Sequence, residues 1–121
     1  MTQKYCRGDI FFITDGVYIG SEQNAGRPGV IVSNNIGNKY SPNVEIVFLT
    51  TQKKKLMPTH AKVLCKYPSI ALCENIQTIS KERLDNFIRS CTPNEMKNID
   101  LALLYSLGLH IPTSVSETTL L

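Results

Sequence analysis

The alternation of apolar and polar residues along the chain predicts a series of short strands followed by helices. Apolar, β-branched and aromatic residues dominate the segments that we predict to be strands, namely 9–14, 29–33, 44–50, 60–65 and 69–78. The second of these is almost continuously apolar, which is typical of a central strand buried on both faces. Between them, 34–42 has the composition of a turn, whereas 15–27 and 52–58 read as loops. Since the first of these loops is long, it is a candidate for a functional role.

After residue 79 the pattern changes from strand to helix. Ser80 is a good N-cap and predicts a short helix over 81–88 that ends at Cys91 and Thr92. A capping box with proline at the first helical position, Thr92-Pro93-Asn94-Glu95, starts a second helix, which Gly108 ends. This helix carries an apolar stripe made of Met96, Ile99, Leu103 and Leu107. Strands followed by helices predict an α+β domain with a small antiparallel barrel over residues 1–110, and a disordered tail over 111–121.

Composition limits the classes of protein that this chain can be. A length of 121 residues fits one domain, and 42% hydrophobic with 19% charged residues is ordinary globular composition. The net charge of +3 permits an RNA or acidic protein partner without requiring one. There is no signal-peptide pattern and no apolar run near the roughly 20 residues of a membrane span, so we expect a cytoplasmic protein that does not bind membranes.

The cysteines do not have the spacing of a metal site. They lack C-x-x-C pairs and neighbouring histidines, which makes zinc binding a poor interpretation of Cys6, Cys65, Cys73 and Cys91. We expect free thiols in a reducing compartment, and neither a metal nor a cofactor.

Two basic segments are candidates for binding phosphate. Arg27 stands at the end of the loop 15–27, directly before Pro28 and the apolar strand, and no other charged residue lies between Glu22 and Lys39. A cation held on a rigid strand suits an anion site, although a surface arginine on a hairpin would give the same pattern. Lys53, Lys54 and Lys55 would contact phosphates without reading sequence, or would simply be solvated.

Several blocks, in order, resemble one family. The segment from Gly20 to Pro28, Gly-Ser-Glu-Gln-Asn-Ala-Gly-Arg-Pro, resembles the GSEQxxxRP loop of the MazF/PemK toxins, which are ribosome-independent endoribonucleases of bacterial toxin–antitoxin pairs. Further blocks are Arg-Gly-Asp-Ile at 7–10, Ile-Gly-Asn-Lys-Tyr-Ser-Pro at 36–42, and the segments 49–52, 56–63 and 78–84. The resemblance covers roughly residues 5–109.

The resemblance implies a fold and a reaction. The fold is the SH3-like barrel that MazF, PemK and the gyrase poison CcdB share. The reaction is metal-independent, sequence-selective cleavage of single-stranded RNA, in which the 2′-hydroxyl attacks the adjacent phosphorus. Arg27 and Thr50 match the catalytic arginine and threonine of the family. For Thr50, a β-branched residue chosen for strand propensity is the alternative, and Thr51 beside it makes the assignment ambiguous.

Other residues are candidates for substrate contacts or proton transfer. The expected RNA-binding residues are Ser21, Glu22, Gln23, Lys53, Lys54 and Gln77. Glu22 could also act as a base or orient Arg27. His60 has a suitable ordinary pKa, but the Pro-Thr-His segment of the family begins a strand, so we expect a structural role for it. The chain departs from the family pattern at two places. Family members often have glycines where this chain has Asn24 and Ala25, and the segment Asn75–Gln77 lacks one cation that the family commonly has. The second departure bears on base selection.

The resemblance also implies partners. We expect a homodimer held by an acidic antitoxin, with operator DNA reached only through that antitoxin. Two alternatives share the barrel: a CcdB-like toxin that inhibits a protein without cutting RNA, and an inactive relative that only binds an antitoxin. Arg27 and Thr50 at the nuclease positions argue against the first. The second stays open, because two matching side chains do not establish productive geometry.

Overall fold

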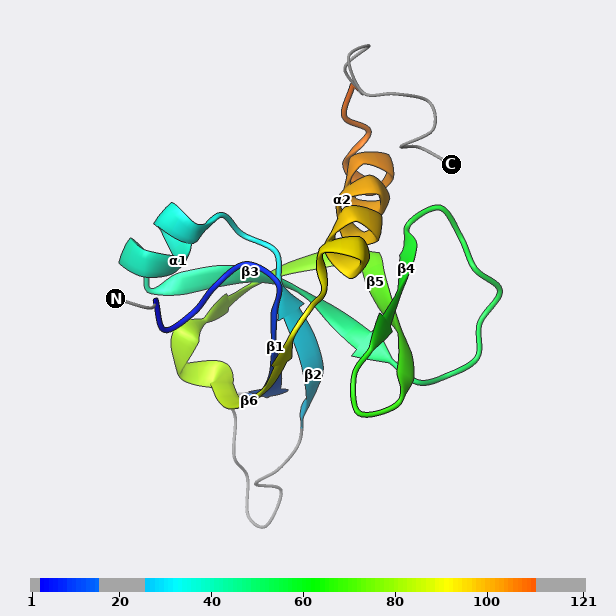
Figure 1. Ribbon diagram of the computed structural model, residues 1–121. Coiled ribbons are helices and arrows are strands. Elements are labelled where there is room, and N and C mark those ends of the chain that lie inside the picture. Colours follow the sequence, from blue (N-terminus) through cyan, green and yellow to red (C-terminus); the bar gives the residue numbers. More distant parts are fainter. Residues whose placement is uncertain (1–2, 16–25, 111–121) are drawn as a thin grey trace.

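The fold is a strongly curled antiparallel sheet covered on one side by a C-terminal helix (Figure 1). The computed structural model describes residues 3–15 and 26–110. The strands are β1 (Asp9–Thr14), β2 (Gly26–Ile31), β3 (Asn43–Thr50), β4 (His60–Leu64), β5 (Pro68–Ser80) and β6 (Leu84–Ser90). The helices are α1 (Asn35–Tyr40), the 3-10 turn η1 (Lys81–Arg83) and α2 (Pro93–Leu107). The predicted α+β class is confirmed.

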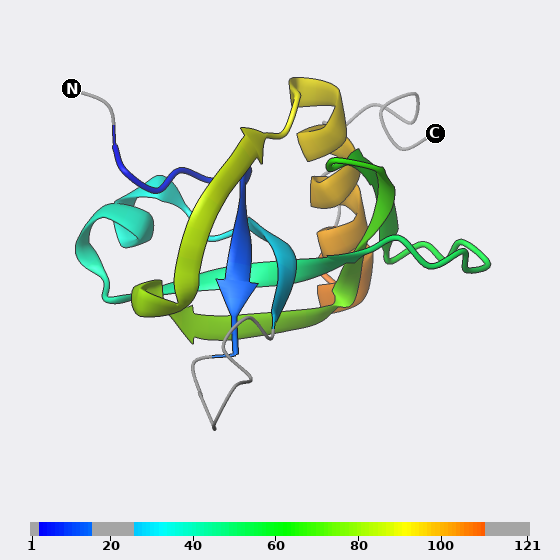
Figure 2. The ribbon, with the colours of Figure 1, turned by 90° about the horizontal axis from the view of Figure 1, so that it is seen from below.

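The six strands lie in the order β4-β5-β3-β2-β1-β6, and every neighbouring pair is antiparallel. All the predicted strands are present; β1 has the predicted ends, and the other four have at least one end shifted. β2 begins at Gly26 instead of residue 29, so Arg27 belongs to a strand and not to the preceding loop. β5 pairs with both β4 and β3. Its first half pairs with β4, and its pairing with β3 shifts register between Val47 and Leu49, which accompanies the bend seen in Figure 2.

The prediction of a helix over 81–88 is wrong. Ser80 does cap a turn, since its hydroxyl accepts the Glu82 N–H at 3.2 Å, but that turn is only η1. The chain then forms β6, whose Phe87 is opposite Phe11 of β1. The edge of β1 would otherwise be open, and pairing with it satisfies the backbone hydrogen-bonding groups of this segment. The prediction failed because a local capping residue gives no information about this tertiary contact.

The prediction of a turn over 34–42 is also corrected, because this segment contains α1. Asn34 caps the helix by accepting the Gly37 N–H at 2.8 Å. The Asn38 side chain is buried and donates to the Ser33 carbonyl at 2.8 Å. These bonds stabilise a short helix that the composition of the segment does not suggest.

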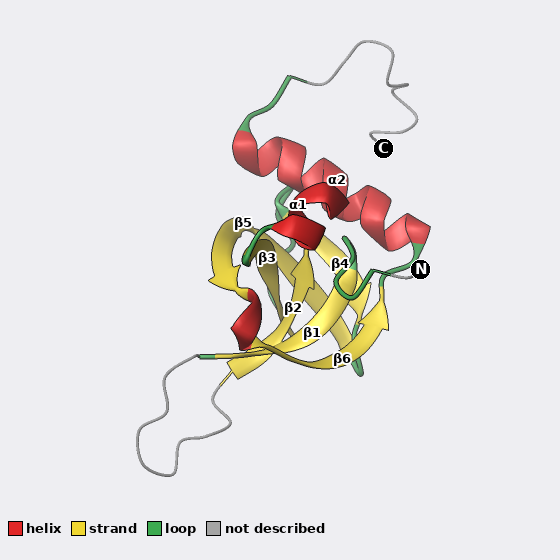
Figure 3. Cartoon of the chain, turned by 90° about the vertical axis from the view of Figure 1, so that its left-hand side faces the viewer, coloured by secondary structure: helices red, strands yellow, loops and turns green. Residues whose placement is uncertain are grey.

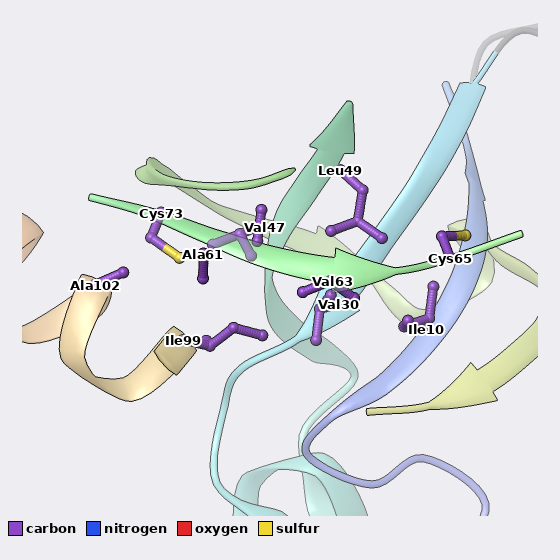
Figure 4. Close-up of a cluster of buried hydrophobic side chains, with 11 residues drawn as sticks. Ile10, Val30, Val47, Leu49, Ala61, Val63, Cys65, Cys73, Ile99 and Ala102 are labelled. Carbon is purple, nitrogen blue, oxygen red and sulfur yellow. The ribbon is translucent and has the colours of Figure 1, made fainter. Parts of the chain in front are cut away.

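The core has two parts, one on each face of the sheet. One cluster lies between the sheet and α2 and contains Val30, Val47, Ala61, Cys73, Ile99 and Ala102 among others (Figure 4). The other lies on the opposite face and consists of Phe11, Ile13, Ile31, Val44, Ile46, Phe48, Ile79 and Leu84. β2 contributes to both, which confirms that it is a central strand buried on both faces. Figure 3 shows α2 lying across one side of the curled sheet.

The C-terminal helix begins and ends where its sequence predicts. Thr92 and Glu95 form the capping box, and Gly108 adopts a left-handed conformation with φ of 64°. Ile99 is fully buried, whereas Leu107 is 57% exposed, so only part of the predicted stripe belongs to the core. Residues 111–121, for which we predicted a tail, lie outside the described residues.

The described part of the chain contains no helix long and apolar enough to cross a membrane. Within the same ranges, no group of three His, Cys, Asp or Glu side chains could hold a metal ion. The four cysteines are free thiols, and burial raises the pKa of Cys73 and of Cys91 to about 12.

Candidate active site

Strand pairing fixes the position of Arg27. It lies opposite Ile13 of β1, and Gly26 before it lies opposite Thr14. The two strands approach so closely here that a Cβ on Gly26 would lie 2.1 Å from the Ile13 carbonyl oxygen, and the φ of Gly26 is 151°. Only glycine fits at this point. The glycine before the arginine is therefore what allows β2 to begin early enough to carry Arg27.

The Arg27 guanidinium lies over an aromatic ring. Its central carbon is 4.3 Å from the centroid of the Phe48 ring. None of the ion pairs formed within residues 3–15 and 26–110 includes Arg27. A guanidinium carries five N–H donors and stays charged at any physiological pH. With its central carbon over the ring and no carboxylate among its partners in the described ranges, Arg27 is suited to present these donors to an anion.

Thr50 is the last residue of β3 and lies opposite Ile70 of β5. Its hydroxyl oxygen accepts the Gln52 N–H at 3.2 Å. Because that bond uses a lone pair of the oxygen, the hydroxyl proton is available for donation to a ligand. Thr51 lies beyond the end of the strand, so the alternation of strand faces does not separate the two threonines.

Arg27 and Thr50 line the same cleft, which has a volume of about 430 Å³. Its other lining residues are Pro28, Leu49, Thr51, Gln52, Cys65, Lys66, Tyr67 and Ser69. A neighbouring groove of about 670 Å³ shares Thr50, Thr51, Gln52, Tyr67 and Ser69 with the cleft, and adds Lys53, Lys62 and Leu64 among others. The fold thus brings the two predicted catalytic residues together and surrounds them with lysines.

The other predicted site residues have different positions. Lys53 lines the neighbouring groove, whereas Lys54 lies on the exposed segment after β3 and lines neither hollow. Gln77 is on β5, opposite Ile46, and it also lines neither hollow. Ser21, Glu22 and Gln23 lie outside the described residues, as do Asn24 and Ala25. Their roles therefore stay predictions.

Sequence reasoning missed the turn between β4 and β5. Lys66 and Tyr67 of this turn line the cleft together with Arg27, and Tyr67 is 63% exposed. A lysine beside an aromatic residue is a feature of RNA-binding surfaces. That pair was visible in the sequence, but its position beside Thr50 depends on the pairing of β5 with β3.

His60 supports the local structure at the start of β4. Its Nδ1 accepts the Met57 N–H at 3.2 Å, its Nε2 lies 3.1 Å from Glu74 Oε2, and its side chain is 3% exposed. Burial acts to raise the pKa of Glu74, but hydrogen bonds from its own backbone N–H and from His60 hold that pKa below its usual value. His60 lines neither hollow, so it is poorly placed to transfer a proton at Arg27.

Comparison with known proteins places this chain in a family. The family of PemK-like, MazF-like toxins of type II toxin–antitoxin systems matches residues 6–107. The chain is 37% identical over 109 residues to Endoribonuclease EndoA of Bacillus subtilis (strain 168), covering 85% of this chain and 94% of that protein.

Solved structures agree with the sequence relatives. An endoribonuclease from a mycobacterial species, in complex with its cognate antitoxin, superimposes with a TM-score of 0.75 at 29% identity, over 88% of this chain and 98% of that one. MazF from Deinococcus radiodurans superimposes with a TM-score of 0.70 over 86% of this chain and 96% of that one; at 15% identity it shows the fold alone. The chain therefore belongs to the PemK-like, MazF-like family of toxins of type II toxin–antitoxin systems.

Proposed function

We propose that this protein is an endoribonuclease toxin that cleaves single-stranded RNA at selected sequences, without a metal ion, and that an antitoxin inhibits it. The observation that carries the proposal is the shared cleft of Arg27 and Thr50. The relationship to Endoribonuclease EndoA supports the reaction class. The lysines around the cleft support a polyanionic substrate.

In the proposed reaction the 2′-oxygen attacks the adjacent phosphorus while the bond from phosphorus to the 5′-oxygen breaks. The products are a 2′,3′-cyclic phosphate and a 5′-hydroxyl. Negative charge develops on the non-bridging phosphate oxygens, where preorganised donors contribute most to the rate. In this proposal Arg27 donates two hydrogen bonds to these oxygens and Thr50 donates one hydrogen bond. Arg27 is also the proposed proton donor to the leaving 5′-oxygen.

The 2′-hydroxyl must also lose a proton. Arg27 is a poor acceptor because its guanidinium keeps its protons above pH 12. Glu22 is the nearest carboxylate in sequence, and we propose it as the first candidate for the base, with Ser21, Gln23, Lys53, Lys54 and Gln77 as substrate contacts.

We further propose a cytoplasmic homodimer whose partner is an acidic antitoxin, with operator DNA bound only through that antitoxin. A mycobacterial endoribonuclease at 29% identity is known in complex with its cognate antitoxin, which supports this partner class. A carboxylate-rich segment would be attracted to the same basic cleft as RNA. If RNA and antitoxin bind at the same time without weakening each other's affinity, the shared site is ruled out. Light scattering at micromolar concentration tests the dimer, and a monomer would contradict it.

The deciding experiment is RNA cleavage in EDTA. The purified protein is incubated with RNA of mixed sequence, and the new ends are mapped, with Arg27→Ala as the matched control. We expect cleavage that persists in EDTA and leaves cyclic phosphate and 5′-hydroxyl ends. Cleavage that requires added Mg²⁺ or Mn²⁺ and leaves 5′-phosphates would contradict the mechanism. The absence of any cleavage, together with tight antitoxin binding, would favour the inactive relative.

A further inference from the structure

We propose that Phe48 is a positioning residue for RNA cleavage, because its ring holds the Arg27 guanidinium in the orientation that binds the phosphate. This inference rests on the proposed function. Phe48 belongs to none of the sequence blocks that resemble the toxin family, and it does not line the cleft. Its role follows from its contact with Arg27 and from the way that β2 and β3 pair.

The register of the two strands places the ring under the arginine. Phe48 of β3 is directly opposite Gly29 of β2, and Arg27 is two residues from Gly29 on the same face. Diagonal neighbours in an antiparallel pair are within reach of aromatic and long side chains. The central carbon of the guanidinium is accordingly 4.3 Å from the centroid of the ring.

Gly29 leaves the space that the surrounding side chains occupy. A Cβ at this position would be 2.5 Å from Ile13 Cδ1 and 3.6 Å from Phe48 Cδ1. Ile13 and Phe48 therefore pack directly over the backbone of β2, where any larger residue at position 29 would require Ile13 to move. The glycine thus lets the ring pack close to the strand that carries Arg27.

Burial makes the ring a rigid support. Phe48 is 8% exposed and belongs to the core cluster that includes Ile13, Ile31 and Ile46. Such a ring is too covered to stack on an RNA base. It is instead well placed to restrict the rotamers of a long side chain that lies on it, which reduces the entropy lost when the phosphate binds.

An aromatic support also differs chemically from a carboxylate. A ring attracts the cation through its quadrupole and contacts the guanidinium without accepting its N–H donors. A carboxylate would accept those donors and neutralise the charge, as Asp100 does for Arg7 at 2.7 Å. Phe48 therefore orients Arg27 while leaving both its charge and its hydrogen bonds for the substrate.

The first test compares Phe48→Leu with Phe48→Tyr in single-turnover cleavage at saturating RNA. We expect Phe48→Leu to lower the rate about two- to fivefold, the magnitude of a cation–π contact at an exposed arginine, and Phe48→Tyr to stay close to the wild type. Phe11→Leu is the matched control, because Phe11 is 6% exposed in the same core cluster, whereas the cation–π contact found for Arg27 within the described residues is with Phe48. It should lower stability and leave the rate of the folded protein unchanged.

A second measurement does not depend on activity. Ring currents from Phe48 should shift the NMR signals of the Arg27 Nε–H and Cδ protons upfield. Phe48→Leu should move these signals toward their ordinary values, whereas Phe11→Leu should not. Unchanged Arg27 signals in Phe48→Leu would overturn the proposed contact even if the protein proved inactive on RNA.

The outcomes separate this inference from the proposed function. If the wild type cleaves RNA and Phe48→Leu cleaves equally fast, Phe48 has no positioning role while the proposed function stands. If Phe48→Leu and Phe11→Leu lose rate equally, the effect belongs to the core in general and the inference is again wrong. If the wild type does not cleave RNA at all, the proposed function fails, and Phe48 then has no role in catalysis. The NMR signals still test separately whether Phe48 contacts Arg27.

Discussion

Two arginines, one before the first strand of the sheet and one within its second strand, are held in opposite ways. Arg7, before β1, donates from Nε to the Val32 carbonyl at 2.8 Å and from Nη2 to Asp100 at 2.7 Å. Arg27, on β2, lies on the Phe48 ring and takes part in none of the ion pairs among residues 3–15 and 26–110. The hydrogen bonds of Arg7 join the residue after β2 to α2, whereas Arg27 lines a cleft. The first arginine supports the fold and the second is available to a ligand.

The same division applies to the blocks that resemble the toxin family. In the Arg-Gly-Asp-Ile block, Asp9 accepts the Cys6 N–H at 3.0 Å and the Ser90 hydroxyl at 2.7 Å. In the Ile-Gly-Asn block, buried Asn38 bonds to Ser33 and Asn35. Both blocks hold the fold together. A match to a family motif therefore does not by itself indicate a catalytic residue. The hydrogen-bond partners of a side chain distinguish residues that support the fold from residues that are available to a ligand.

The largest expected effect comes from the arginine in the cleft. Arg27→Lys should be nearly as damaging as Arg27→Ala, with a loss on the order of 10²–10³ in single-turnover rate, or about 3–4 kcal/mol. A single ammonium cannot reproduce the planar fork that donates two hydrogen bonds to one phosphate. Thermal unfolding should be almost unchanged in both variants. Full activity in Arg27→Lys would reduce Arg27 to a counter-ion.

Next is the buried amide that supports the fold. Asn38→Ala should lower the free energy of unfolding by about 2–3 kcal/mol, because it leaves polar partners such as the Ser33 carbonyl and hydroxyl without their hydrogen bonds. Asn43→Ala, at an exposed position, is the control and should stay within about 0.5 kcal/mol. Denaturant unfolding measures both. A loss of cleavage in folded Asn38→Ala would mean that this region also serves the site.

A smaller effect is expected at the threonine. Thr50→Val keeps the β-branched shape and removes the hydroxyl, so the rate should fall about tenfold, corresponding to ~1.4 kcal/mol. A neutral hydroxyl donor contributes less than the charged guanidinium. Thr51→Val tests the ambiguity between the neighbours, since both side chains line the cleft. A larger loss in Thr51→Val than in Thr50→Val would reverse the assignment.

The smallest effect should come from the exposed lysines. Lys54→Ala should change binding by less than about 1 kcal/mol and reduce the salt dependence slightly, because its charge lies in high dielectric outside both hollows. Lys53→Ala should have the larger effect, since Lys53 lines the groove beside Thr50. RNA affinity measured over a range of salt concentrations tests both. Equal effects would indicate that the whole segment binds RNA diffusely.

Much of the secondary structure could be predicted because its signals are local. The strands follow from apolar and β-branched runs, and α2 follows from its capping box and terminal glycine, which act within a few residues of the chain. The family was predicted from blocks of sequence in the same order as in its members. The resemblance in turn identified Arg27 and Thr50 as the candidate catalytic pair. These features require no knowledge of which strands become neighbours.

The rest depended on contacts between distant residues. The segment after Ser80 is a strand only because the edge of β1 accepts it, and α1 forms only around the buried Asn38. The β2–β3 register puts Phe48 beneath Arg27, and the β4–β5 turn brings Lys66 and Tyr67 to the same cleft. Sequence by itself determined which residues could carry the chemistry. Tertiary structure decided which of them meet, because strand register is set by packing across the whole sheet and not by the spacing of residues along the chain.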